Sequence, residues 1–202
     1  MPVERERTSS AGNGCIMRLA PVVIAGFTFR RLKDIVSMAR ISARETHYSI
    51  EAEAATEVFA ALLVGAMRGL RKDQLLDVSW ASTGPDFDEV VQRTIHWDAD
   101  TRALSEHETN GYVIHGLALA VHGLMDFDSF EEGALMIASL GGDADTNAAI
   151  YGQLAGAFYG VESIPRAWRE ILFEGEEICS LADALLGLPI SEKAKTRFAE
   201  DL

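Results

Sequence analysis

Residues 129–160 read SFEEGALMIASLGGDADTNAAIYGQLAGAFYG, and this stretch decides the fold. Ser129 followed by Glu132 has the spacing of a capping box, in which two side chains satisfy backbone N–H groups at the start of a helix. The apolar run 134–140 continues that helix, and two glycines then interrupt it. A second helix is predicted over 143–159, so the stretch encodes two consecutive helices.

One face of the second predicted helix carries small residues. Gly152, Gly156 and Gly160 are four residues apart, and we expect another helix to approach this face closely. The same spacing marks helix pairs in membranes. Here the stretch also carries polar side chains, which indicate a buried helix of a soluble protein: Asp143, Asp145, Asn147 and Gln153. Burial of this helix would hold its first turn rigid, as a metal site requires.

The rest of the chain also favours helices. Segments 22–84 and 86–164 contain no proline. The clearest helix is predicted over 50–69, where apolar residues follow a 3.6-residue period: Ala55, Val58, Phe59, Leu62 and Ala66. Further helices are predicted over 32–42, 87–96, 111–125 and 174–186, and after Pro165. The β-branched residues of 111–125 leave a strand as the alternative there. We predict an all-α, multi-helix fold with one domain over residues 1–202.

Composition excludes several classes of protein. Lys and Arg total 18 against 31 Asp and Glu, and the resulting net charge of −13 argues against nucleic acid or an anionic membrane as a general partner. The first residues contain no apolar segment typical of a secretory signal, and no run reaches the ~18 apolar residues of a membrane span. Two distant cysteines imply no disulfide framework, so we expect a cytoplasmic protein.

The sharpest chemical feature is Gly-Gly-Asp-Ala-Asp-Thr-Asn at 141–147. Asp143, Asp145 and Thr146 place two carboxylates and a hydroxyl in one helical turn, and oxygen ligands of this kind suit Mg²⁺ or Mn²⁺. The alternative is helix capping, with Asp143 as the N-cap and the other two as ordinary first-turn residues. Spacing alone leaves both interpretations open.

A second feature is Ser-Ala-Gly-Asn-Gly at 10–14, a tight turn before a helix. Exposed backbone N–H groups at such a turn can hold a phosphate, although Gly-Asn-Gly also occurs as a plain turn. His47 lies between two predicted helices, where it could face a ligand, cap a helix or be solvated. No His-Glu-x-x-His or Cys-x-x-Cys motif supports a zinc site.

These features together resemble the ADP-ribosylglycohydrolase family. Four segments match in the family's order: GNGCIMRLAPV at 12–22, the Thr46-His47 turn, Gly111-Tyr112-Val113, and the whole of 129–160. The pattern Ile164-Pro165-x-x-Trp168 fits the family's usual continuation. The long last segment is the specific one, and the resemblance extends over almost the whole chain.

The resemblance implies an all-α fold with a two-metal centre, usually of Mg²⁺ or Mn²⁺. It implies hydrolysis of the N- or O-glycosidic bond that links ADP-ribose to a protein side chain or small acceptor. Asp143, Asp145 and Thr146 would be metal ligands. The remaining implied site residues contact or approach ADP-ribose: Ser10, Gly12, Asn13 and Gly14 in the diphosphate and ribose loop, His47 beside the diphosphate, and Gly111 and Tyr112 near the ligand. No catalytic residue is assigned.

The sequence departs from the family pattern in two places. Ala144 stands where the family commonly has Thr. The family's N-terminal Thr-Asp-Asp metal triplet has no counterpart before Gly12. We therefore expect either a complementing N-terminal segment or a homo-oligomer that covers the apolar faces left behind. The alternatives to a hydrolase are a catalytically incomplete ADP-ribose-binding or regulatory module, and a helical scaffold without a ligand.

Overall fold

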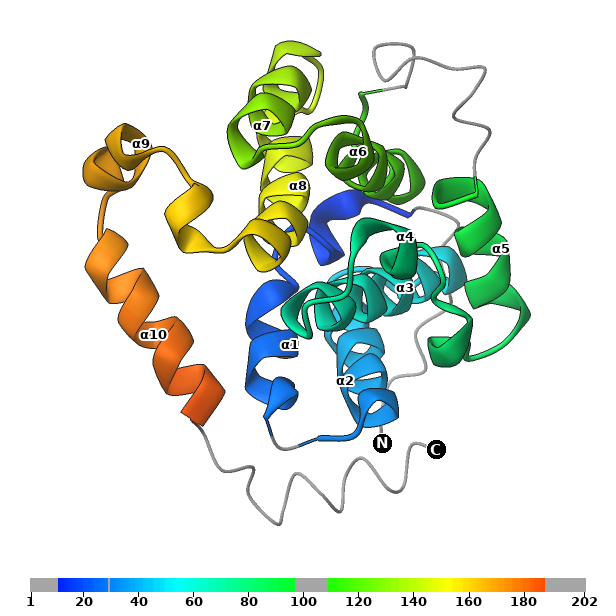
Figure 1. The fold of residues 1–202 in the computed structure, drawn as a ribbon. Coiled ribbons are helices and arrows are strands. Elements are labelled where there is room, and N and C mark those ends of the chain that lie inside the picture. The colour runs from blue at the N-terminus through cyan, green and yellow to red at the C-terminus, as the bar shows by residue number, and fades with distance from the viewer. Residues whose placement is uncertain (1–10, 29, 97–108, 188–202) are drawn as a thin grey trace.

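The computed structural model describes residues 11–28, 30–96 and 109–187, and helices dominate this part of the chain (Figure 1). The described residues contain no strand beyond an isolated antiparallel bridge between Gly12 and Tyr112. The predicted all-α fold is confirmed. Ser10 lies outside the described residues, so its predicted role has no structural counterpart here.

Helix α3, Ile50–Met67, forms the centre of the molecule. Every residue from Ala52 to Ala66 is buried, so the single apolar stripe expected from the sequence is only part of its contact surface. Its start is fixed by Ser49, whose Oγ accepts a hydrogen bond from the Ala52 N–H at 3.1 Å. The helices that pack on it include α2 (Leu32–Arg44), α5 (Pro85–Thr94), α6 (Val113–Asp126) and α8 (Ala144–Tyr159).

Helices α6, α7 (Phe130–Ser139) and α8 pack against one another on one side of α3. The segment for which a strand was the alternative is thus a helix, α6. Ser129 begins α7 as predicted, with its Oγ accepting from the Glu132 N–H at 3.2 Å. Gly141 and Gly142 lie in the connection between α7 and α8, with φ values of +75° and +62°, a region that strongly favours glycine.

A helix was expected after the Gly12–Gly14 turn without stated bounds, and α1 (Ala20–Phe27) follows that turn. The four-residue α4 (Lys72–Leu75) was not predicted. The short 3₁₀ turns are η1 (Asn13–Cys15), η2 (Ser79–Ala81) and η4 (Val161–Ser163). After Pro165 the chain forms α9 (Arg166–Ile171) and α10 (Gly175–Gly187). Helix α10 lies beside α1, and none of its residues is buried (Figure 1).

The close helix approach expected at the glycines of α8 is wrong. A Cβ added to Gly152 or Gly156 would meet no described atom within 4 Å. Close approach occurs instead on the partner helices of α8. A Cβ on Gly116 of α6 would lie 2.9 Å from Ile150, and one on Gly133 of α7 would lie 2.2 Å from the Tyr151 hydroxyl. Large side chains of α8 therefore fill gaps left by glycines on its neighbours.

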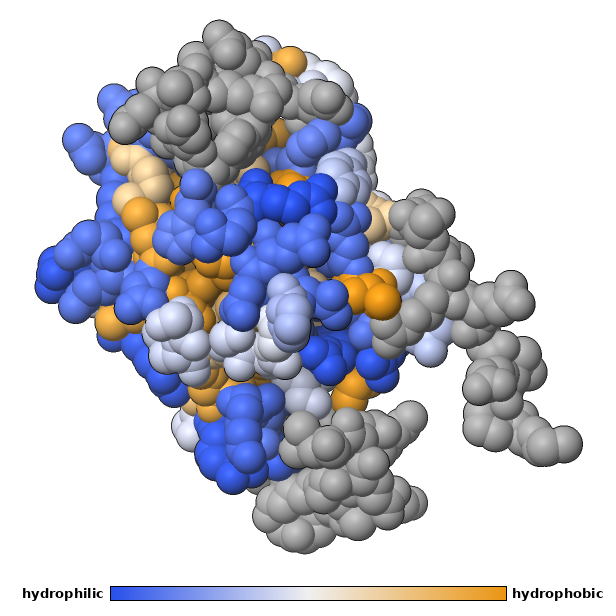
Figure 2. Space-filling view, turned by 90° about the vertical axis from the view of Figure 1, so that its right-hand side faces the viewer, coloured by the Kyte–Doolittle hydropathy of each residue, from blue (hydrophilic) through white to orange (hydrophobic). Residues whose placement is uncertain are grey.

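The face around α5 is mostly hydrophilic, with apolar residues visible between the polar ones (Figure 2). This agrees with the exposed polar side chains of α5 itself, such as Asp86, Asp88 and Gln92. Among the described residues, no helix combines the length and the apolar character needed to cross a membrane.

Candidate functional site

One hydrogen bond joins the two sequence features that carried the chemistry. The Asn13 side-chain amide donates from Nδ2 to Asp143 Oδ2 at 2.7 Å, although the residues are 130 positions apart. Asn13 is buried and Asp143 is half-buried. The Gly-Asn-Gly turn and the first turn of α8 therefore form one site rather than two.

The loop before α6 completes the site and holds both turns in place. The backbone N–H of Asn13 donates to the Gly111 carbonyl at 2.8 Å, and that of Asp143 donates to the Thr109 carbonyl at 2.7 Å. A Cβ on Gly142 would lie 2.3 Å from the Thr109 carbonyl oxygen, so this loop can approach only a glycine. Thr109 had not been singled out from the sequence, which gives no local signal for it.

Asp143 occupies the N-cap position of α8, yet its side chain makes no capping hydrogen bond. Its carboxylate turns to Asn13 instead. Asp145 is exposed, and its Oδ1 accepts from the Thr146 N–H at 2.9 Å. Of the two interpretations left open by the spacing, the geometry disfavours capping by Asp143 and leaves its carboxylate facing the site.

The donor set suits a hard cation. Asp143, Asp145 and Thr146 offer carboxylate and hydroxyl oxygens on one helical turn. No group of three or more His, Cys, Asp or Glu side chains positioned to hold a metal occurs within residues 11–28, 30–96 and 109–187. Mg²⁺ commonly takes one or two carboxylates and completes its shell with water, so the residues present fit such an ion.

The glycines of the Gly12–Gly14 turn are explained by His47. Gly12 has an ordinary φ of −74°, so its backbone does not demand glycine. A Cβ on Gly12 would instead lie 2.8 Å from His47 Nε2, and one on Gly14 would lie 2.9 Å from His47 Cε1. One N–H that we expected to be exposed for an anion, that of Asn13, is used inside the protein by Gly111.

His47 is half-buried at the junction of α2 and α3. Its Nδ1 lies 2.9 Å from Thr46 Oγ1, and Thr46 Oγ1 accepts a hydrogen bond from Arg18 Nη2 at 3.0 Å. Burial, followed by the positive charge of Arg18, lowers the pKa of His47 from its usual value. This shift favours the neutral imidazole at neutral pH.

Tyr112 is anchored by two charged residues that the sequence did not reveal. Its hydroxyl donates to Glu51 Oε1 at 2.5 Å and accepts from Arg93 Nη2 at 2.6 Å. Arg93 also forms an ion pair with Glu51. Burial, followed by the hydrogen bond to Glu51, raises the pKa of Tyr112. Glu51 and Arg93 are far from Tyr112 in sequence, so no motif could have linked them.

Seven of the predicted site residues thus come together around the Asn13–Asp143 contact: Gly12, Asn13, Gly14, His47, Gly111, Tyr112 and Asp143. Asp145 and Thr146 follow on the first turn of α8.

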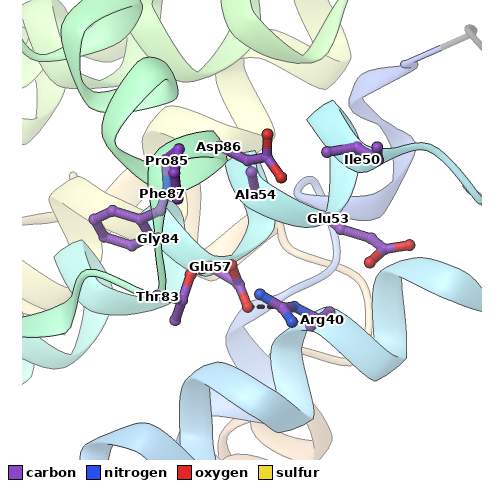
Figure 3. A pocket seen from close by; sticks show the side chains of 10 residues that line it. All are labelled: Arg40, Ile50, Glu53, Ala54, Glu57, Thr83, Gly84, Pro85, Asp86 and Phe87. Carbon is purple, nitrogen blue, oxygen red and sulfur yellow. Dashed lines mark hydrogen bonds and ion pairs between the residues drawn. The ribbon is translucent and has the colours of Figure 1, made fainter.

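A separate cavity of about 110 Å³ lies between α2, α3 and the start of α5 (Figure 3). Two buried carboxylates of α3 line it. Glu57 pairs with Arg40 Nε at 2.5 Å and accepts from the Thr83 hydroxyl at 2.7 Å, and Glu53 pairs with Arg44 at 3.0 Å. None of the predicted site residues lines this cavity. Because arginines already compensate these carboxylates, the cluster serves to join α2 to α3.

The chain resembles several known proteins in sequence. It is 33% identical over 179 residues to ADP-ribosylarginine hydrolase Tri1 of Pseudomonas putida (strain GB-1), covering 88% of this chain and 46% of that protein. It is 29% identical to the ADP-ribosyl-dinitrogen reductase glycohydrolase of Rhodospirillum rubrum, covering 88% of this chain and 57% of that protein. The chain spans about half the length of the curated relatives it matches.

The fold has a solved counterpart. A chain described as an ADP-ribosylglycohydrolase-related protein complex superposes with a TM-score of 0.75 and 40% sequence identity, over 88% of this chain and 60% of that one. The model of the ADP-ribosylglycohydrolase family matches residues 2–195, which includes the segments quoted above. The chain therefore belongs to the ADP-ribosylglycohydrolase family.

Proposed function

We propose that this chain binds ADP-ribose and contributes to hydrolysis of the glycosidic bond between ADP-ribose and a protein side chain or small acceptor, with Mg²⁺ or Mn²⁺. The observation that carries the proposal is the hydrogen bond from Asn13 to Asp143. It joins the turn expected to hold the diphosphate and ribose to the turn expected to hold a metal. The family match and relatives named as ADP-ribosyl hydrolases support this assignment.

Asp143, Asp145 and Thr146 would hold the divalent ion. When bound, such an ion would orient ribose hydroxyls and make a nearby water more acidic. The chain's own contribution is positional. Asn13 fixes one oxygen of the Asp143 carboxylate by hydrogen bonding, and the Thr109 carbonyl fixes the backbone of the same residue. A carboxylate held in this way needs little rearrangement to receive a cation.

The residues around the turn would receive the nucleotide part of the ligand. Gly12 and Gly14 have no side chains, so the His47 ring reaches the turn itself. The neutral imidazole can offer one N–H to an anionic oxygen without a repulsive neighbour on the turn. Tyr112 bridges to Gly12 through its backbone and is held by Glu51 and Arg93 through its hydroxyl. His47 and Tyr112 are therefore already held in place beside the turn before a ligand binds.

The test is a calorimetric titration of ADP-ribose into the purified chain, with and without Mn²⁺. We expect metal-dependent binding that Asp145→Ala abolishes. Asp183→Ala, which removes an exposed carboxylate on α10, is the matched control and should bind as the unmodified chain does. Loss of ~1 kcal/mol of stability in Asp145→Ala, equal with and without metal, would instead indicate a first-turn structural role. If a folded chain does not bind ADP-ribose, the result would support the alternative of a helical scaffold without a ligand.

Hydrolysis is tested separately from binding. Two relatives are named ADP-ribosylarginine hydrolase, so ADP-ribosylated arginine is the first substrate to supply. Release of ADP-ribose in the presence of Mn²⁺ would establish a hydrolase. Binding without release would identify an ADP-ribose-binding module, the alternative function. Light scattering on the same sample would show whether the chain works as a homo-oligomer.

A further inference from the structure

A hydroxyl group lies between a guanidinium and an imidazole beside the Gly12–Gly14 turn. Arg18 Nη2 donates to the Ser42 carbonyl at 3.1 Å and to Thr46 Oγ1 at 3.0 Å. Thr46 Oγ1 in turn lies 2.9 Å from His47 Nδ1. Three residues from two segments of the chain thus form a short hydrogen-bonded row that ends at the imidazole.

The direction of the Arg18–Thr46 hydrogen bond follows from which groups carry protons. A guanidinium donates only, so Thr46 Oγ1 must be the acceptor in its bond with Arg18. The hydroxyl keeps one proton of its own, which it can donate to His47 Nδ1. An imidazole whose Nδ1 accepts carries its single proton on Nε2 when it is neutral.

The opposite edge of the His47 ring faces the turn. His47 Nε2 would lie 2.8 Å from a Cβ on Gly12, and Cε1 would lie 2.9 Å from a Cβ on Gly14. No hydrogen bond joins Nε2 to another residue in the part of the chain that the structure describes. A proton carried on Nε2 would therefore be available to a ligand at this turn.

We propose that Arg18 and Thr46 are positioning residues that hold His47 as its Nε2–H tautomer, so that the ring offers an N–H donor to an anionic oxygen bound at the Gly12–Gly14 turn. The ligand's identity as ADP-ribose rests on the proposed function, whereas the tautomer does not. In the other tautomer, the lone pair of Nε2 would face the same oxygen and repel it.

The surroundings keep His47 in the form for which the tautomer matters. Burial and the charge of Arg18 lower its pKa, which favours the neutral ring at neutral pH. In a protonated ring both nitrogens would donate, and Thr46 could not select between them. Thr46 is exposed, so its side chain can be altered with little effect on packing.

The experiment compares the unmodified chain with Thr46→Val and Thr46→Ser. Valine keeps the shape of threonine but removes the hydroxyl, and serine restores it. Long-range proton–nitrogen correlation spectra of histidine-labelled protein report which ring nitrogen carries the proton. The His47 signals are assigned by their loss in His47→Gln. We expect Nε2–H in the unmodified chain and in Thr46→Ser, and a mixture or Nδ1–H in Thr46→Val.

Two spectroscopic results would overturn the proposal: Nδ1–H in the unmodified chain, or an unchanged tautomer in Thr46→Val. The same variants are then titrated with ADP-ribose and Mn²⁺. Loss of one N–H donor to a charged oxygen predicts about tenfold weaker binding by Thr46→Val, with recovery in Thr46→Ser. If the unmodified chain binds no ADP-ribose, the proposed function fails while the spectra still decide the tautomer. Equal binding by Thr46→Val and the unmodified chain would exclude the positioning role.

Discussion

Two groups of glycines in this protein look alike in sequence but differ in what surrounds them. Those of the Gly12–Gly14 turn and of α6 and α7 lie where another side chain reaches the backbone. Gly152 and Gly156 of α8 lie where no described atom comes near. The spacing of glycines in a sequence therefore does not show by itself that another element packs closely against them. The side chain that fills the space beside each glycine must also be known. For the first group of glycines the partners are Ile150 and Tyr151 of α8, Ile137 of α7, and His47.

The largest effect is expected from Gly133→Ala. The new Cβ would lie 2.2 Å from the Tyr151 hydroxyl and 2.5 Å from its ring carbon Cζ. Tyr151 is fully buried, and its hydroxyl donates to the Phe130 carbonyl, so moving the ring would disturb both its packing and this hydrogen bond. We expect unfolding in urea to show a loss of about 3 kcal/mol. A loss of unfolding free energy below about 0.5 kcal/mol would mean that α7 shifts to make room for the methyl group. The crowded and the open glycines would then not differ in their tolerance of alanine.

Gly12→Ala should act on binding rather than on stability. The new Cβ would displace the His47 ring, which lies at the end of a side chain and can swing away cheaply. Calorimetry should show ADP-ribose affinity lower by about tenfold to hundredfold, since one donor to a charged group is lost. Gly152→Ala is the control, because it adds the same methyl group in open space. Unchanged affinity in Gly12→Ala would show that the His47 ring does not contribute to ADP-ribose binding.

Acid should lower the stability of the fold through His122, which lies on α6 next to Gly123. Burial, the main cause, lowers the pKa of His122, although its hydrogen bond to the Thr94 carbonyl opposes the shift. The unfolded chain then binds a proton near its usual pKa of about 6.5, while the folded chain binds it only at lower pH. Stability contributed by the neutral ring is therefore lost as pH falls below about 6.5.

The measurement is the free energy of unfolding at several pH values, for the unmodified chain and for His122→Gln. The variant cannot titrate at this position, so its stability should fall less steeply between about pH 7 and pH 5. Identical slopes for the two proteins would show that His122 protonates equally well in the folded and unfolded chains.

The smallest effect, and one of opposite sign, is expected from Gly156→Ala. No described atom lies within 4 Å of the new Cβ, and alanine is the better residue inside a helix. Thermal unfolding should show a gain of roughly 0.5–1 kcal/mol. A loss of stability would show that this face of α8 is covered in solution, and light scattering would then tell whether a second copy covers it.

The sequence predicted the elements whose signals are local. The periodicity of 50–69 and the cap at Ser129 correspond to α3 and α7. The bounds of helix α1 were not predicted because its cap comes from far away in the sequence. The backbone N–H of Ala20 donates to Gln153 Oε1 of α8 at 2.7 Å, a contact that no local pattern can indicate. The expected packing of Gly152 failed for a similar reason, since spacing describes one helix and not its neighbour.

The features of the candidate site also divide into those with a local sequence signal and those that depend on contacts between distant residues. The hypothesis of oxygen ligands on the first turn of α8 came from spacing, and the family resemblance linked that turn to Gly12, Asn13 and His47. Neither could show that Glu51 and Arg93 hold Tyr112, because these contacts join separate helices. Whether Asp143 capped its helix was also undecidable from the sequence, since the answer depends on Asn13, 130 positions away.

The same Asn13–Asp143 hydrogen bond makes the site a reporter of complete folding. Asn13 leaves the ribosome long before α8 is made. A nascent chain that ends before residue 143 therefore cannot form the Asn13–Asp143 hydrogen bond. Closing a segment of this length carries an entropic cost that only the packing of the helices between can offset. A ligand held by both residues therefore binds the finished fold alone and protects it from unfolding. Partly folded chains would be distinguished by their failure to respond to it.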